Sequence, residues 1–174
     1  KYLCVAESGL SHAVSPAGAV GFWQFMKPTA KEYNLEVNKE IDERYHVLKS
    51  TEAACQYLLD SYEKYGNWTL VAASYNAGRN GISRRMQQQE AGSYYDLILP
   101  DETSRYIYRI LAIKLIFEQP EEYGFYVEED DYYQPLPVTH EEVSGKIDSW
   151  GEFANKRGLS YKLLKYFNPW LRQN

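Results

Sequence analysis

Apolar residues recur at helical spacing in three parts of the chain. In residues 54–65 they stand three or four positions apart, and Gly66 follows as a typical helix stop. Residues 102–117 repeat the pattern with one apolar face. Residues 70–75 are apolar on all sides, which favours a buried helix or strand. The pattern predicts a mainly α protein, with Ser50 as the N-cap of the first of these helices.

Shorter segments precede these helices. Residues 2–8 are apolar up to Glu7-Ser8 and are typical of the last turns of a helix. Residues 9–21 are rich in Gly, Ser, Ala and Pro, which predicts a loop, and a short helix is expected near Pro28. Because the chain starts at Lys1 with neither an initiator Met nor a signal peptide, we expect a fragment or a processed product.

The character of the chain changes after residue 117. Residues 118–137 carry acidic residues, tyrosines and prolines with little periodicity, which indicates a linker or strap. Residues 138–147 are predicted to form a short strand, and two short helices are expected over 148–157 and 160–166. We therefore expect a helical domain over 1–117, the strap over 118–137 and a small C-terminal appendage over 138–174.

Composition narrows the possible partners. The chain has 174 residues, which suggests one domain with a small addition. Its net charge of −5 argues against nucleic acid. The apolar runs are far shorter than the ~20 residues of a membrane span, so any membrane association needs a segment outside this sequence. We expect a monomer. The two cysteines, Cys4 and Cys55, are interpreted as buried thiols, with one disulfide as the alternative.

Several kinds of chemistry lack their sequence pattern. The three histidines lie far apart, and none belongs to an HExxH or HxH arrangement, so no metal site is expected. The chain has no GxSxG nucleophile motif, and its glycines do not form a phosphate-binding loop. We expect no cofactor. Carboxylates remain as the candidate catalytic groups.

Glu7 is the carboxylate with the most apolar surroundings. It ends the apolar run 2–6, close to the negative end of the predicted helix. Partial burial and the helix dipole would both raise its pKa and keep it protonated near neutrality. A general acid for glycosidic cleavage needs that property, whereas an ordinary helix-end glutamate is the alternative interpretation.

Three motifs occur in order along the chain. The first contains Glu7-Ser8, a short loop, a glycine-rich turn and a Gln followed by a Pro-x-Thr-Ala segment. The second is Tyr-Asn-Ala-Gly, and the third is Glu-Thr followed by a Tyr and a helix. The segments that form them are Glu7–Leu10, Ser15–Ala19, Gly21–Met26, Pro28–Ala30, Tyr75–Gly78, Glu102-Thr103, Tyr106 and Ile110–Ala112. Together they resemble the motifs of the lytic transglycosylase family, which has the fold of goose-type lysozyme. Within the family, the D type shares the segment Trp23-Gln24-Phe25-Met26.

The resemblance implies a mainly α, lysozyme-like catalytic domain that acts on peptidoglycan in the bacterial cell envelope, on the periplasmic side. Glu7 matches the single catalytic acid/base. Glu102 matches a second acidic residue that binds sugar or supports the site and is not a nucleophile. The positions that match sugar-subsite residues are Ser15, Gln24, Met26, Tyr75 and Asn76.

Structural alternatives stay open for several of these positions. Ser8 can simply brace the Glu7 helix, and Gly18 and Gly21 can serve loop conformation. Trp23 and Met26 can belong to the core. The C-terminal appendage loosely resembles half of a LysM unit, and it can either bind glycan or pack against the catalytic domain.

Cleavage with a single catalytic carboxylate is chemically consistent with the family resemblance. Glycosidases usually use two carboxylates, and a one-carboxylate enzyme must take its second group from the substrate. The acetamido oxygen of N-acetylmuramic acid can supply that group, after which the C6 hydroxyl closes onto C1 as a 1,6-anhydro product. Two alternatives remain: a hydrolytic muramidase or chitinase on the same fold, and a non-catalytic glycan-binding module.

Overall fold

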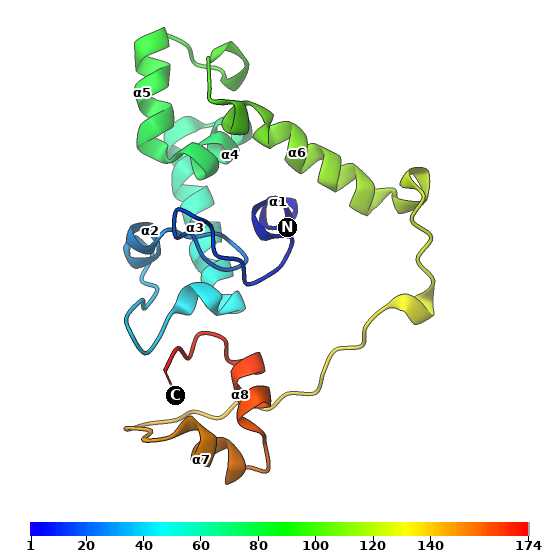
Figure 1. The fold of residues 1–174 in the computed structure, drawn as a ribbon. Helices are drawn as coiled ribbons and strands as arrows, with labels where there is room; N and C mark the ends of the chain where they lie inside the picture. Colours follow the sequence, from blue (N-terminus) through cyan, green and yellow to red (C-terminus); the bar gives the residue numbers. More distant parts are fainter. Residues whose placement is uncertain (174) are drawn as a thin grey trace.

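The computed structural model describes residues 1–173, and these residues form a mainly α-helical protein (Figure 1). The predicted fold class is confirmed. Helix bounds are α1 Tyr2–Ser8, α2 Lys27–Glu32, α3 Val47–Tyr65, α4 Trp68–Ala77, α5 Arg79–Gln89, α6 Asp101–Glu118, α7 Trp150–Asn155 and α8 Tyr161–Phe167. Short 3-10 turns lie at Glu43–Tyr45, Tyr94–Asp96, Pro120–Tyr123 and Glu129–Asp131.

The long helix α3 begins earlier than the sequence predicts. His46 is its N-cap, with a ring nitrogen that accepts from the Lys49 amide. The predicted cap Ser50 is wrong: it lies fully buried inside the first turns, and its hydroxyl donates to the Val47 carbonyl. The helix ends as predicted at Gly66, which has φ 62°, a left-handed conformation that glycine adopts without steric cost.

Two apolar clusters hold the helical body together. The first lies between α1, the loop before α2, and α3: Cys4, Trp23, Phe25, Ala30, Leu35, Val37, Ala53 and Ala54. The second joins α4, α5 and α6: Leu70, Ala73, Ile82, Tyr94, Leu97 and Ile107. The segment 70–75 is therefore helical, and α4 packs against α3, α5 and α6. Helix α5 has no predicted counterpart.

Helix α6 runs from the body past α1 and on into the solvent (Figure 1). Its first half is anchored by Thr103, Tyr106 and Ile107, which are buried, whereas Leu115 and Phe117 near its end are exposed. The segment 121–146 that follows is exposed throughout and returns along an open arc to the C-terminal helices. This agrees with the expected strap, although the three predicted domain boundaries stay a prediction.

The C-terminal segment folds into two short helices with serine caps. Ser149 accepts from the Glu152 amide at the start of α7, and Ser160 accepts from the Leu163 amide at the start of α8. The predicted strand over 138–147 is wrong, because these residues pair with no strand in the part of the chain that the structure describes, and residues 138–146 are exposed.

The C-terminal segment also contacts the helical body. The Asp42 amide donates to the Trp170 carbonyl at 2.9 Å, and the Arg172 amide donates to the Glu40 carbonyl at 2.7 Å. The rings of His46 and Trp170 lie 4.1 Å apart. Packing against the body, one of the two roles left open for this segment, is therefore present.

The two cysteines differ. Both are free thiols, but Cys4 is buried and Cys55 is exposed on α3. The prediction of two buried thiols is thus right for Cys4 and wrong for Cys55, because Cys55 stands on the outer side of its helix. Within residues 1–173, no helix is both long and apolar enough to cross a bilayer.

Candidate active site

The end of helix α1 places Glu7. The helix stops at Gly9, which has φ 59° and donates its amide to the Val5 carbonyl. The Ser8 hydroxyl donates to the Phe22 carbonyl at 2.9 Å, and the Cys4 thiol contacts the same carbonyl at 3.3 Å. Ser8 therefore braces the helix against the loop that follows, and Glu7 is held at a fixed place.

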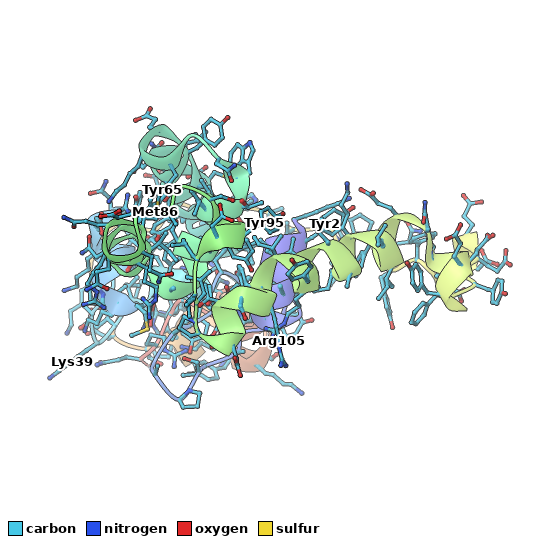
Figure 2. All side chains as sticks on the ribbon, turned by 90° about the horizontal axis from the view of Figure 1, so that it is seen from above. Tyr2, Lys39, Tyr65, Met86, Tyr95 and Arg105 are labelled. Carbon is cyan, nitrogen blue, oxygen red and sulfur yellow. The ribbon has the colours of Figure 1, made fainter. Side chains whose placement is uncertain are left out.

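Glu7 makes its closest polar contact with α6. The hydroxyl of Tyr106, a side chain that is only 1% exposed, donates to Glu7 Oε1. Helix α1 lies along α6 in the opposite direction, since Tyr2 at its start donates to Glu118 Oε1 at 2.9 Å. Figure 2 shows Tyr2 and α1 beneath α6. The catalytic candidate therefore faces the buried first half of α6.

Burial raises the pKa of Glu7 above its usual 4.5 and is the largest cause of the shift. The nearby charge of Glu102 raises it further, while the Tyr106 hydrogen bond and the charge of Arg109 lower it. The raised pKa agrees with the sequence argument from burial, because a carboxylate loses its hydration when it leaves water. Glu7 is thus suited to hold a proton at a higher pH than an exposed glutamate.

Tyr75 lies near the same carboxylate. Its pKa is raised well above 10, mainly by burial and then by the charge of Glu7. Its hydroxyl donates to the Trp23 carbonyl at 2.8 Å, so it also ties α4 to the loop before α2. Tyr75 remains a neutral phenol on the wall of the site.

Asn76 and Glu102 form a second polar pair beside Glu7. The Asn76 amide donates to Glu102 Oε1 at 3.2 Å, and the Thr103 hydroxyl donates to Asn76 Oδ1 at 2.8 Å. Glu102 is exposed at the start of α6. The pair therefore joins the second and third sequence motifs across the α4–α6 contact.

The side chains of Ser15 and Gln24 form hydrogen bonds within the glycine-rich loop. Ser15 Oγ accepts from the Ala19 amide at 3.0 Å, and Gln24 Nε2 donates to the carbonyls of Ala13 and Gly21 at 3.0 and 2.8 Å. Gln24 has φ 48°, and its own side chain holds the turn. Within residues 1–173 neither side chain hydrogen-bonds to Glu7, and the bonds that they do form shape the loop.

Gly21 has the conformational role that was expected for the glycines of this loop. Gly21 has φ 79°, and a Cβ at that position would lie 2.1 Å from the Arg44 carbonyl oxygen. Arg44 is buried, pairs with Asp42, and donates to the carbonyls of Gly18 and Phe25 at 3.1 Å each. The loop is thus clamped to the segment before α3.

The structure places Trp23 and Met26 in different environments. Trp23 is 7% exposed, and its indole donates to Thr51 Oγ1 at 2.8 Å, so it belongs to the core. Met26 is 41% exposed at the start of α2, so the core interpretation is wrong for it, and its assignment as a sugar-subsite residue stays a prediction.

The structure therefore groups Glu7 with Tyr75 and Glu102 and adds two residues that were not proposed for the site. Tyr106 contacts Glu7 directly, and Arg109 lies one helical turn further along α6. Their spacing from Glu102, four and seven positions, is the signal that places them on the same side of a helix. Two open hollows elsewhere, of about 500 Å³ at residues 141–157 and 580 Å³ between α2 and α3, do not include Glu7.

Two family models match separate parts of the chain. Residues 1–98 match the model of the transglycosylase SLT domain, and residues 139–174 match that of the soluble lytic transglycosylase C-terminal LysM-like domain. The chain is 30% identical over 172 residues to "Membrane-bound lytic murein transglycosylase D" of Escherichia coli K12, and equally so to its counterpart of the same name in Escherichia coli O6:H1. These matches cover 95% of this chain but only 37% of the length of either relative.

Proposed function

Since this chain belongs to the transglycosylase SLT domain family, we propose that it is a peptidoglycan lytic transglycosylase with Glu7 as its only catalytic acid/base. The observation that carries the proposal is the half-buried carboxyl of Glu7, with its raised pKa and its hydrogen bond from Tyr106. The substrate is the β-1,4 bond between N-acetylmuramic acid and N-acetylglucosamine. The similarity to relatives named as murein transglycosylases supports that choice.

In the first step Glu7 acts as the general acid. Its carboxyl proton passes to the glycosidic oxygen as the bond to C1 breaks, and the acetamido oxygen of the muramic acid attacks C1 to form an oxazolinium-type ring. Glu7 is left as a carboxylate, which the Tyr106 hydroxyl stabilises by donating a hydrogen bond. Burial keeps enough of the acid protonated for this step.

In the second step the same carboxylate acts as the base. It takes the proton of the sugar's C6 hydroxyl, and O6 displaces the acetamido oxygen at C1. The product is a 1,6-anhydro-muramyl end, Glu7 is protonated again, and no water is consumed. Substrate assistance accounts for how one carboxylate does the work of the usual pair.

The remaining polar groups serve binding and positioning. Tyr75, Asn76 and Glu102 supply phenol, amide and carboxylate groups suited to a polyhydroxylated sugar chain. Ser15 and Gln24 hold the glycine-rich loop in shape, as their hydrogen bonds to its backbone suggest, and Met26 offers exposed apolar surface beside it. We assign no cofactor and expect a monomer in the bacterial periplasm, where its substrate lies.

The hydrolytic alternative depends on Glu102. An inverting muramidase needs a second carboxylate that activates water, and Glu102 is the acidic residue whose charge acts on Glu7. However, Glu102 accepts from Asn76 at 3.2 Å, which fits a group that positions neighbouring side chains. We therefore favour the transglycosylase reaction.

The test is the variant Glu7→Gln. The amide keeps the shape and can still accept from Tyr106, but it cannot transfer a proton. Cleavage of purified sacculi should fall by at least the ~10²–10⁴-fold typical of a lost general acid/base, while glycan binding persists. Glu63→Gln, at an exposed site on α3, is the matched control. Activity of Glu7→Gln within a few-fold of wild type would overturn the assignment.

A further inference from the structure

Two arginines lie on α6 next to the candidate catalytic group. Arg109 stands seven positions after Glu102 and three after Tyr106, and Arg105 precedes Tyr106. At 3.6 residues per turn, Glu102 and Arg109 share almost the same direction, with Arg105 on their outer side. Because Tyr106 contacts Glu7, this stripe of α6 borders the site. Figure 2 shows Arg105 near the point where α6 passes over α1.

Neither guanidinium group is used by the fold. Arg105 and Arg109 are both exposed, and neither forms an ion pair or a side-chain hydrogen bond within residues 1–173. Other arginines of the chain do have carboxylate partners: Arg44 pairs with Asp42, Arg79 with Glu32 and Arg157 with Glu141. The positive charge beside the site therefore remains available to a ligand.

The charge of Arg109 nevertheless reaches the reacting group. It lowers the pKa of both Glu7 and Tyr106. Arg109 stands one helical turn after Tyr106, the residue that contacts Glu7, and it forms no ion pair with Glu7 within residues 1–173. Its guanidinium is therefore not occupied by the candidate catalytic carboxylate.

We propose that Arg109, assisted by Arg105, binds a carboxylate of the peptide stem that the glycan strand carries, and so makes the site selective for strands with anionic stems. This inference rests on the proposed function, because it names the part of the same substrate that lies beside Glu7. A guanidinium group suits the task because it binds a carboxylate through two parallel hydrogen bonds.

Charge complementarity supports this choice of ligand. The chain carries a net charge of −5, and the exposed carboxylate of Glu102 would repel an anionic stem from the site. The strap, residues 118–137, adds further acidic residues and contains no Lys or Arg. The two arginines are cations on the α6 stripe that borders Glu7, so they are the groups placed to offset that repulsion.

The test compares two forms of one substrate. Soluble glycan strands with intact stems are divided, and in one half the stem carboxyls are converted to neutral amides with carbodiimide and ammonium. The wild-type protein should cleave the amidated strands with a kcat/KM about tenfold lower, since a charge-assisted hydrogen bond is lost. Arg109→Gln should cleave the native strands about tenfold more slowly and no longer distinguish the two forms, whereas Arg109→Lys should recover part of the preference.

The matched control is Arg84→Gln, which removes an exposed arginine of α5 that has no ion pair within residues 1–173. It should keep the full preference for native strands. Equal rates of wild type on both substrates would overturn the inference. So would an Arg109→Gln variant that keeps the tenfold preference, even if its pH profile has moved, because Arg109 would then act only on the pKa of Glu7.

Failure of the proposed function gives a different result. If wild type releases no anhydro-ended products from either form, the reaction assignment is wrong. The carboxylate contact can still be tested by calorimetry. The affinities of native and amidated muropeptides are measured for wild type and for Arg109→Gln. A tenfold weaker affinity of wild type for the amidated ligand, absent in Arg109→Gln, supports the inference, and equal affinities refute it.

Discussion

Replacing Tyr106 by Phe isolates one hydrogen bond on the candidate catalytic group. The Tyr106 ring is buried, and its hydroxyl donates to Glu7 Oε1. The Phe ring fills the same space, so the variant changes the hydrogen bond far more than the packing. Because that bond favours the charged carboxylate and lowers the pKa of Glu7, its removal should raise the pKa further.

The size of the effect follows from the energy of such a bond. A hydrogen bond to a charged group contributes about 1.5–3 kcal/mol. The protonated acid also accepts this bond, more weakly, so only the difference between the two forms shifts the pKa. Since one pKa unit corresponds to about 1.4 kcal/mol, we expect the pKa of Glu7 to rise by about one unit. The rate at the pH optimum should fall by no more than about tenfold, because the proton-transfer group is still present.

The assay is the pH dependence of muropeptide release from sacculi. The alkaline limb, where the general acid loses its proton, should move to higher pH by about one unit in Tyr106→Phe. Tyr108→Phe, on the same helix but 57% exposed, should leave the limb in place. An unchanged or lowered limb in Tyr106→Phe would refute the role given to this hydrogen bond.

Protein stability gives an independent check of the sign. A carboxyl whose folded pKa is raised contributes stability below its unfolded pKa, near 4.5, and that contribution is lost as the pH rises through the folded value. Tyr106→Phe raises the folded pKa further. Its loss of unfolding free energy relative to wild type should therefore be larger at pH 7 than at pH 4, and the opposite order would contradict the argument.

Three further outcomes are expected. Glu102→Gln should keep anhydro-ended products and most of the rate, because the amide oxygen still accepts from Asn76, whereas Glu102→Ala should lose more; reducing-ended products from wild type would reopen Glu102 as a base. A thiol reagent should label Cys55 in the folded protein and Cys4 only after unfolding, because burial raises the Cys4 pKa to about 11; rapid native labelling of Cys4 would contradict its place in the core. Gly21→Ala should lower the thermal unfolding temperature much more than Gly18→Ala. Both positions have positive φ, but only at position 21 would the new Cβ lie 2.1 Å from the Arg44 carbonyl oxygen; equal losses would contradict the importance of this clash.

The sequence predicts the long helices well because each of them buries one face, and a buried face requires apolar residues at helical spacing. It misplaces the start of α3, because Ser50 resembles a cap locally but is buried by tertiary packing, while His46 supplies the cap. It also predicts a strand over 138–147, where β-branched residues stand without a partner strand. Local pattern cannot reveal whether a partner is present.

In the candidate site, too, some features follow from local sequence and others only from tertiary packing. The burial of Glu7 follows from the apolar run before it, and the raised pKa follows from that burial. The Tyr106 contact joins residues 99 positions apart, so only the packing of α1 on α6 reveals it. Ser15 and Gln24 match sugar-subsite positions in sequence, yet their side chains bond to the backbone of their own loop.

The reaction itself is tested most directly by the fate of water oxygen. Sacculi are digested by the protein in water enriched in oxygen-18, and the released muropeptides are weighed by mass spectrometry, with Glu7→Gln as the blank. If the C6 hydroxyl closes onto C1, the products carry anhydro-muramyl ends with no label, and each is one water lighter than the corresponding hydrolysis product. Muramyl ends that carry oxygen-18 at C1 would mean that water attacks, and they would contradict the transglycosylase mechanism.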